Sequence, residues 1–382
     1  MYAPGRRWRP QEKPAKPSNN HFNFKKEYFI MKKVISLVLS VMMMLTMFAG
    51  CKASGTAETA APTAAPTAAP TSSTAAETSA DTTPAVQEFN VAIVQQLDHA
   101  SLDEIRTAIV AQLQTLAEEK GVKVNIQEFN GQNDATVLNQ IGAQVVGDGV
   151  DVIIPIATLA AQCMVTAADG TDIPIVYAAI SDPEAAGLTG LSNVTGTSDA
   201  LNTAFILDMM LAANPDIETV GLLYSNSEAN STTPIAEAKA YLQEKQIDFV
   251  EKTGNTSGEI VEAAASMVGR VDAVFTPTDN VVMAAEVTVA ETLNEAGIPH
   301  YTGADSFVAA GAFATCGVNY TELGTYTADM AMDILLGGAV PEFHVMDGGI
   351  ITVNTETAAI LGIDYSVFSS MANTVVEVKT GE

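Results

Sequence analysis

Short apolar stretches alternate with longer segments of helical length from residue 89 to the end of the chain. We expect strands at 90–94, 122–128, 152–156, 173–178, 194–196, 220–224, 248–252, 272–275, 300–302 and 313–318. Helices are predicted at 102–119, 135–147, 159–168, 200–213, 259–267, 281–296 and 321–336, with one more after the loop at 225–233. Strands that alternate with helices of this length are typical of parallel sheets with right-handed crossovers. The pattern therefore predicts an α/β fold.

The segment 219–241 shows one unit of this pattern. An apolar run at 220–224 is followed by a polar loop, 225–233, and then by a helix. In an open α/β sheet, ligands bind at this carboxyl end of the strands. Similar polar loops follow other strands, at 95–98, 157–158, 181–183, 276–280 and 304–306. We expect these loops to point at a common ligand site.

Two series of these units resemble each other. VDVIIPIAT begins at residue 150 and VDAVFTPTD at residue 271, and Thr158 and Asp279 lie at the same distance from the Asp of each motif. VAIVQQLDHASLDEI and VGLLYSNSEANSTTP also each begin with an apolar strand and continue into a polar helix start. Two similar α/β lobes predict a cleft between them, walled by both sets of loops. Chance similarity among βα units is the alternative.

The amino-terminal part of the chain has the features of a secretion signal. Residues 31–51 combine a basic start, an apolar run too short for a spanning helix of about 20 residues, and Cys51. The sequence FAGC at 48–51 is similar to the lipobox of bacterial lipoproteins, with Phe48 where Leu is usual, and implies lipidation of Cys51. An uncleaved anchor helix is the alternative. Residues 52–87 are rich in Ala, Thr and Pro and are predicted to form a disordered tether. Residues 1–30 are interpreted as a mis-assigned or disordered extension.

The charge of the chain is uneven. Residues 1–51 contain nine of the 18 basic residues and two of the 45 acidic ones, so the remainder carries nine basic and 43 acidic residues, a formal charge of −34. A protein body this acidic repels phosphate backbones, so we expect no nucleic-acid partner.

Catalytic and metal-binding patterns are weak. Beyond residue 51 the histidines are His99, His300 and His344, in separate segments, and neither HExxH nor GxxxxGK occurs. The rare cysteines Cys163 and Cys316 form no CxxC pattern and are interpreted as small buried residues. We therefore expect no enzymatic activity, no metal and no cofactor.

The predicted loops are rich in Ser, Thr, Asn and Asp and poor in Lys and Arg. Helix starts offer free N–H groups that suit a carboxylate. Asp279 and Asp305 suit a cationic amine, so a zwitterion such as an amino acid would use both features. Each of these polar residues has a plain alternative role as the N-cap of its helix.

Seven motifs together resemble one family, the lipoprotein substrate-binding components of ABC importers that include tryptophan-type aromatic amino acid binders. The motifs are LDHASLD from residue 97, IATLAAQ from 156, AAISDPEAAGL from 178, NVTGTSD from 193, LYSNSEANS from 223, TPTDN from 276 and GVNYTELG from 317. They follow the family order over about 290 residues. Ala100 and Leu159 depart from it, because the family usually has Pro at both positions.

The resemblance implies a type I periplasmic-binding-protein fold, with two Rossmann-like lobes joined by crossover strands and closing on a ligand. Lobe 1 would comprise 88–198 and 320–340, and lobe 2 would comprise 199–319 and 345–380. Crossings are expected near 197–199, 318–320 and 341–345.

The expected ligand is an amino acid with an aromatic or large apolar side chain. Thr158 and Ser181 would bind its carboxylate, and Asp305 or Asp279 its ammonium. The full set of expected ligand-binding residues is Gln96, Leu97, His99, Ala157, Thr158, Ser181, Asp182, Ser227, Asn230, Thr278, Asp279, Asn280 and Asp305.

The implied partners are an ABC permease and its ATPase, and the membrane through Cys51, at the outer face of the bacterial cytoplasmic membrane. We expect a monomer. The alternatives are the same receptor for a nucleoside, sugar or other small metabolite, a secreted α/β hydrolase, or a sensor that signals without transport.

Overall fold

The computed structural model describes residues 86–381, which belong to one compact unit. The predicted signal segment, Cys51 and the tether up to residue 85 lie outside the described residues. Within the described part of the chain, no helix is both long enough and apolar enough to span a bilayer.

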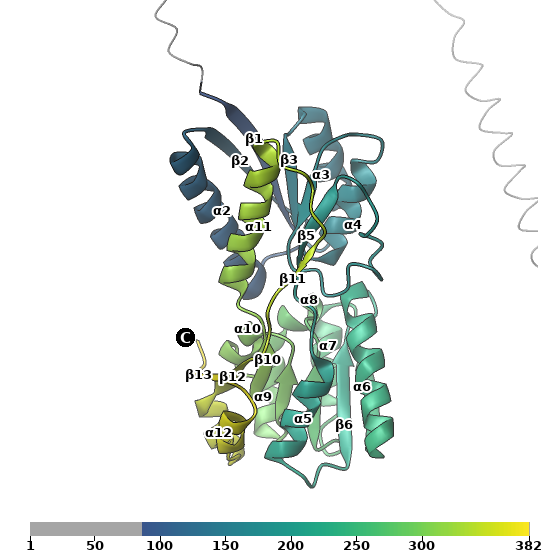
Figure 1. Ribbon diagram of the computed structural model, residues 1–382. Coiled ribbons are helices and arrows are strands. Elements are labelled where there is room, and N and C mark those ends of the chain that lie inside the picture. The colour runs from purple at the N-terminus through teal and green to yellow at the C-terminus, as the bar shows by residue number, and fades with distance from the viewer. Residues whose placement is uncertain (1–85, 382) are drawn as a thin grey trace, which may run out of the picture. The chain divides into compact units, whose positions relative to one another are not determined.

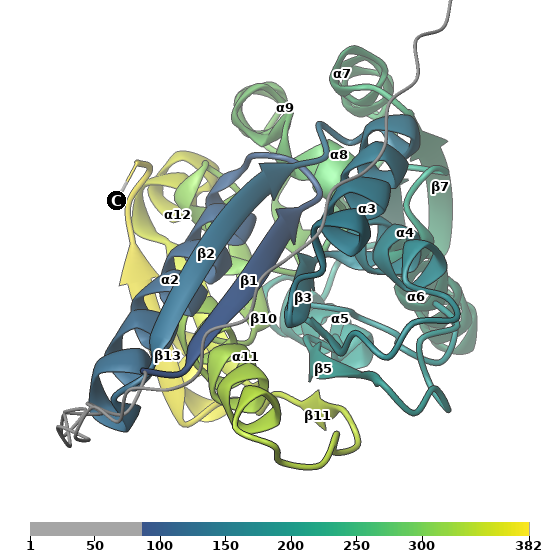
Figure 2. The same ribbon diagram turned by 90° about the horizontal axis from the view of Figure 1, so that it is seen from above.

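The first lobe is built on a six-stranded parallel sheet in the order β11-β5-β4-β3-β1-β2 (Figure 1). Its strands are β1 (Glu88–Gln95), β2 (Lys123–Asn130), β3 (Val152–Ile156), β4 (Ile175–Tyr177), β5 (Val194–Ser198) and β11 (His344–Val345). Helices α2 (Ala100–Lys120) and α11 (Tyr320–Leu335) cover one face, and α3 (Ala135–Asp148) and α4 (Thr158–Ala167) cover the other, as Figure 2 shows.

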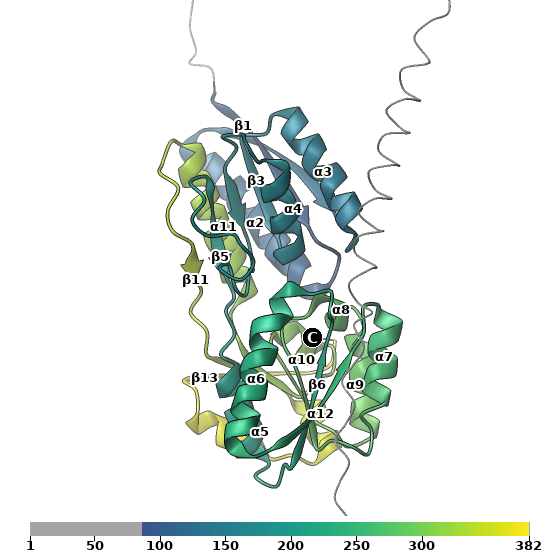
Figure 3. The same cartoon turned by 90° about the vertical axis from the view of Figure 1, so that its right-hand side faces the viewer.

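The second lobe is built on a seven-stranded sheet in the order β13-β12-β10-β9-β8-β6-β7, in which only β10 and β12 pair antiparallel. Its strands are β6 (Thr219–Tyr224), β7 (Asp248–Thr253), β8 (Ala273–Thr276), β9 (His300–Thr302), β10 (Ala314–Gly317), β12 (Ile350–Asn354) and β13 (Thr374–Val378). Helices α5 (Thr203–Ala213), α6 (Thr232–Lys245) and α12 (Thr355–Leu361) pack on one face. Helices α7 (Ser257–Ala265), α8 (Asn280–Met283), α9 (Glu286–Glu295) and α10 (Asp305–Ala309) pack on the other (Figure 3).

The chain passes between the two lobes three times. It leaves the first sheet after β5 to form α5, returns between β10 and α11, and leaves again between β11 and β12. The last passage begins after Val345 and not within 341–345 as expected, because β11 (His344–Val345) pairs with β5 and belongs to the first sheet. The lobes are therefore connected by three chain segments, of which the middle one runs in the opposite direction to the other two.

The predicted α/β alternation is confirmed, and one predicted helix is wrong. The expected helix at 281–296 is two helices, α8 and α9, separated by a turn at Ala284 and Ala285. No Gly or Pro marks this break, so the local pattern gave no signal for it.

The two matching sequence motifs have equivalent structural roles. Asp151, just before β3, accepts a hydrogen bond from the backbone N–H of Asn90 at 2.7 Å, beside the start of β1. Asp272, just before β8, accepts hydrogen bonds from the backbone N–H groups of Glu218 and Thr219 at 2.9 and 2.8 Å, at the start of β6. Each aspartate therefore ties the amino end of one central strand to the next, in both lobes.

Helices α2 and α11 pack closely because of one glycine. A Cβ at Gly324 would lie 2.6 Å from the carbonyl oxygen of Ile105 and 2.8 Å from the Cβ of Ala108. Since the first of these atoms belongs to the backbone, the two helices would have to separate to admit a methyl group.

We therefore expect Gly324→Ala to lower the free energy of unfolding by about 1–3 kcal/mol, the usual cost of overpacking. Gly147→Ala is the matched control, because Gly147 is also helical and a Cβ there meets nothing within 4 Å. That control should raise stability by about 0.5–1 kcal/mol. Denaturant unfolding of both variants tests this, and equal effects of the two substitutions would contradict the packing account.

Candidate functional site

A cavity lined by both lobes lies between the carboxyl ends of the two sheets. Its lining comes from both lobes and comprises His99, Ser101, Leu102, Ala157, Thr158, Ala179, Ser181, Asp199, Asn230, Thr278, Asp279, Asn280, Met283, Ala304, Phe307 and Tyr320. None of these described lining residues is Lys or Arg, which disfavours phosphates and dicarboxylates.

Asp199 is the most unusual group in the cavity. It lies just beyond β5, is 5% exposed, and accepts hydrogen bonds from Ser181 Oγ at 2.9 Å and from the Tyr320 hydroxyl at 3.1 Å. Burial raises the pKa of the Asp199 carboxyl, and the two hydrogen bonds oppose this shift. Among residues 86–381, no Lys, Arg or His forms an ion pair with it. A cationic group of a ligand would supply the missing partner.

The start of α4 faces the same cavity. Ala157 precedes this helix with φ 74°, a left-handed conformation that is rare outside glycine and that is typical of functional sites. The hydroxyl oxygen of Thr158, the first residue of α4, is buried and has no hydrogen-bond partner among the described residues. An unpartnered hydroxyl beside a helix N-terminus suits an anionic group such as a carboxylate.

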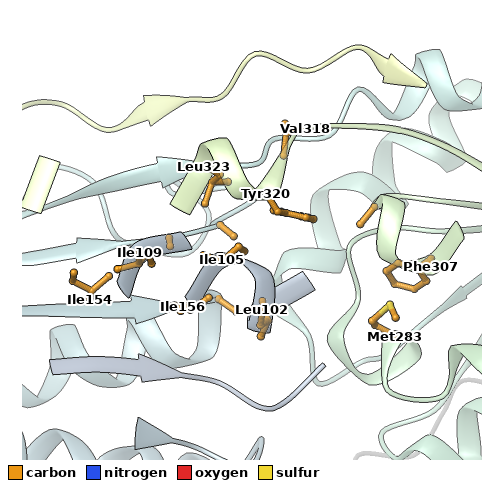
Figure 4. Close-up of a cluster of buried hydrophobic side chains, with 14 of the residues drawn as sticks. Leu102, Ile105, Ile109, Ile154, Ile156, Met283, Phe307, Val318, Tyr320 and Leu323 are labelled. Carbon is orange, nitrogen blue, oxygen red and sulfur yellow. The ribbon is translucent and has the colours of Figure 1, made fainter. Parts of the chain in front are cut away.

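Apolar side chains line another part of the cavity. Leu102 and Tyr320 belong to the first lobe, Met283 and Phe307 belong to the second, and all four are in one buried cluster that spans both lobes (Figure 4). An apolar ligand side chain would therefore contact both lobes at once and favour their closure.

Hydrogen bonds already join the lobes around the cavity. Gln96 Nε2 donates to Glu228 Oε1 at 2.9 Å, and the Ser181 and Thr278 hydroxyls lie 3.0 Å apart. Three further pairs are His99 Nε2 with Asn280 Oδ1 at 2.9 Å, Thr233 Oγ1 with Asp182 Oδ2 at 2.7 Å, and the Ser101 and Ser306 hydroxyls. These contacts define a closed arrangement of the lobes.

Eight of the thirteen predicted site residues line this cavity: His99, Ala157, Thr158, Ser181, Asn230, Thr278, Asp279 and Asn280. The carboxylate of Asp279 is occupied, however, because it accepts bonds from the backbone N–H groups of Val281, Val282 and Ser225 and from the Ser231 hydroxyl. It acts as the N-cap of α8, the alternative that the sequence had left open, and holds the polar loop after β6 in place.

The other five predicted residues lie outside the lining. Gln96 and Asp182 bond across the lobe boundary, and Leu97 packs against the buried cluster. Ser227 is exposed, and its hydroxyl bonds to Ser225 Oγ at 2.7 Å. Asp305 is half-buried, and burial together with the charge of Glu104 raises its pKa to about 6.

Eight lining residues were not predicted: Ser101, Leu102, Ala179, Asp199, Met283, Ala304, Phe307 and Tyr320. Asp199 ends the motif NVTGTSD and Tyr320 lies in GVNYTELG, two family motifs to which the sequence analysis assigned crossings between the lobes but no ligand contact. Their proximity depends on pairing between segments about 120 residues apart, which local patterns do not report.

The described histidines and cysteines form no nucleophile–base pair. His300 is buried and bonds to Glu286 Oε1 and Thr276 Oγ1, at 2.9 and 2.8 Å, inside the second lobe. Cys163 and Cys316 are buried free thiols, as predicted, and burial raises the pKa of each.

Residues 90–375 match the family model for ABC transporter substrate binding proteins. The chain belongs to this family. Such proteins bind small molecules and work with an ABC permease. The predicted resemblance and the predicted receptor class are thereby confirmed.

Individual relatives agree with this assignment. The chain is 32% identical to a curated tyrosine-binding protein of Clostridioides difficile (strain R20291), over 72% of this chain and 81% of the relative. It is 29% identical to a Streptococcus pneumonia ABC domain solved in complex with L-Trp, with a TM-score of 0.70 over 76% of this chain and 100% of the other. It is 32% identical to a ligand-free, open substrate-binding protein with adhesive properties from Clostridium difficile, with a TM-score of 0.59 over 76% and 99%.

The two structural relatives also bear on closure. The L-Trp complex matches this backbone better than the open, ligand-free structure does, although its sequence identity is lower. The difference in sequence identity does not explain why the L-Trp complex has the higher TM-score, because the open structure is the more similar in sequence. The bonds between the lobes give a physical reason for it, because a closed chain superposes poorly on an open one.

The carboxylate of Glu228 generates a testable prediction about stability. Burial, together with the charge of Asp279, raises the pKa of Glu228 to about 7. The folded state therefore binds the proton of the Glu228 carboxyl more tightly than the unfolded chain does, in which the pKa of a Glu is about 4.3. As the pH rises from about 4.3 to 7, this group lowers the free energy of unfolding. Glu228→Gln removes this titration.

Wild type should therefore lose stability relative to Glu228→Gln between about pH 4 and pH 8, by about 1.4 kcal/mol for each unit of pKa difference. Denaturant unfolding across that range gives the measurement. A difference between the two proteins that does not change with pH would contradict the raised pKa.

Proposed function

We propose that the protein is a lipid-anchored, extracytoplasmic receptor that captures an aromatic amino acid and presents it to an ABC permease. Closure of the two lobes would bury the ligand in the cavity. The observation that carries the proposal is the buried carboxylate of Asp199, which has no cationic partner and lies in the same cavity as the start of α4.

The polar groups of the cavity match a zwitterion. Asp199 would accept hydrogen bonds from the ligand ammonium, while Ser181 and Tyr320 hold its two oxygens in place. The Thr158 hydroxyl and the N–H groups at the start of α4 would bind the ligand carboxylate. Asp199 thus replaces Asp279 and Asp305 as the proposed ammonium partner, because Asp279 is occupied as a cap and Asp305 lies outside the lining.

The apolar residues of the cavity support an aromatic side chain. An aromatic side chain buries about 150–250 Å², worth about 4–6 kcal/mol at ~25 cal/mol/Å². A micromolar complex requires about 8 kcal/mol. Burial beside Leu102, Met283 and Phe307 would supply much of this, and the ammonium and carboxylate contacts would supply the rest. The tyrosine and L-Trp named for two relatives fit the same chemistry.

The remaining parts of the proposal concern location and partners. Cys51 would carry the lipid, and the segment 52–87 would hold the binding unit near the outer face of the cytoplasmic membrane. We infer a monomer that acts without catalysis and without a cofactor, with a permease and its ATPase as partners.

Calorimetry with the twenty amino acids tests the ligand class. We expect micromolar or tighter binding of at least one aromatic amino acid. Asp199→Asn should weaken that binding at least about tenfold, because a hydrogen bond to a charged group is worth about 1.5–3 kcal/mol. Asp216→Asn, at an exposed aspartate between α5 and β6 and outside the cavity lining, is the control and should bind normally. If no amino acid bound, the proposed ligand class would be wrong.

The affinity should also depend on pH. Because burial raises the pKa of Asp199 in the free protein and a ligand ammonium favours its ionised form, binding releases a proton. The affinity should therefore fall as pH is lowered through the raised pKa of Asp199. Titrations over a pH series would show this slope in wild type but not in Asp199→Asn, and the same slope in both proteins would count against Asp199 as the ammonium partner.

A further inference from the structure

His99 carries a second polar atom that the proposed function does not use. It lies at the N-cap position of α2 and lines the cavity, and its Nδ1 atom is buried without a hydrogen-bond partner among the described residues. Its other ring nitrogen, Nε2, lies 2.9 Å from Asn280 Oδ1 across the lobe boundary. Which atom of the ring carries the proton decides what the buried Nδ1 can bind.

A chain of four hydrogen bonds determines which ring nitrogen of His99 carries the proton. The backbone N–H of Leu159 donates to Gln96 Oε1 at 3.0 Å, so Gln96 presents its amide nitrogen to the other side and donates to Glu228 Oε1 at 2.9 Å. Glu228 Oε2 then accepts from Asn280 Nδ2 at 2.6 Å. The N–H of Leu159 can only donate, and an ionised carboxylate can only accept, so neither amide can be reversed without losing a bond.

The consequence reaches the ring of His99. Because Asn280 Nδ2 donates to Glu228, the Oδ1 atom of Asn280 faces His99. Oδ1 can only accept, so His99 Nε2 must donate this hydrogen bond. In neutral imidazole the other nitrogen is then a bare acceptor. Burial lowers the pKa of His99, outweighing the Asn280 bond and the charges of Asp103 and Asp98, which raise it, so the ring is neutral at alkaline pH.

The position of His99 suggests which part of a ligand it meets. In the first sheet, β1, which leads to His99, is three strands away from β5, which leads to Asp199. At about 4.8 Å between neighbouring strands, the two loops are separated by about 14 Å. Because both residues line one cavity, an amino acid whose ammonium lies at Asp199 would extend its side chain towards His99.

We propose that His99 Nδ1, held as an acceptor by Glu228 and Asn280, selects aromatic amino acids whose ring edge donates a hydrogen bond, tryptophan and tyrosine, over phenylalanine. This inference rests on the proposed function. His99 would contact the ligand, whereas Glu228 and Asn280 are positioning residues that act through it.

The first test uses the wild-type protein at pH 8.5, where Glu228 is ionised. Calorimetry compares L-tryptophan with β-(3-benzothienyl)-L-alanine, in which sulfur replaces the indole N–H in a ring of similar shape, and L-tyrosine with L-phenylalanine. Each donor-bearing ligand should bind about 5- to 10-fold more tightly than its partner. Equal affinities within both pairs would overturn the inference and leave the proposed function standing. Binding of none of the four would overturn both.

The second test reverses the chain of hydrogen bonds. In Glu228→Gln, residue 228 would accept from Gln96 and donate to Asn280, so Asn280 would turn its nitrogen to His99 and Nδ1 would carry the proton. The indole N–H only donates, so tryptophan should lose most of its advantage. The tyrosine hydroxyl also accepts and should lose less. Phenylalanine makes no bond to Nδ1, so its affinity in the same variant is the baseline against which both losses are measured.

Controls separate selection from damage. Glu237→Gln changes an exposed carboxylate on α6 and should keep the wild-type order of affinities. His99→Leu removes the acceptor without touching Glu228 and should abolish the preference for tryptophan over its benzothienyl analogue. If Glu228→Gln weakened all ligands equally, or if His99→Leu kept the preference, Nδ1 would not be the selecting atom.

Discussion

The closed cavity is organised around a carboxylate that is buried without a cation. Removing Asp199 from water raises the free energy of its charged form, and hydrogen bonds from Ser181 and Tyr320 offset only part of that cost. A ligand ammonium would remove the rest. This gives the protein a physical reason to bind a positively charged group at one point and to close around it, since closure deepens the burial that makes the interaction strong.

The fold places that carboxylate opposite a second set of loops. Parallel sheets deliver all their carboxyl ends to one edge, so two sheets that face each other enclose a single space between two rows of loops. The first row supplies Asp199, Ser181, Thr158 and His99, and the second supplies Asn230, Thr278 and Asn280. Bonds such as Gln96 with Glu228 and Asp182 with Thr233 join the rows outside the cavity lining. The bonds of Ser181 with Thr278 and of His99 with Asn280 join them at lining residues, so closure and ligand contact share side chains.

Much of the fold could be predicted from the sequence, because strand and helix lengths and the repeated VD motif are local signals. The lobes, the parallel sheets and the loops at their ends followed from them. Which individual side chains point into the site could not be predicted from these local signals. Ser227 and Glu228 are neighbours in one loop, yet Ser227 is exposed and Glu228 is buried between the lobes, where it accepts hydrogen bonds from Gln96 and Asn280. Asp199 was missed for a similar reason, because its partner Tyr320 is 121 residues away.

A crystal structure of the protein with bound L-tryptophan would test the central claim most directly. The account predicts that the ligand ammonium lies within hydrogen-bond distance of Asp199, with the ligand carboxylate at the start of α4 and the indole N–H directed at His99 Nδ1. A ligand bound in the reverse orientation, with its ammonium away from Asp199 and the Asp199 carboxylate still without a cationic partner, would contradict the account.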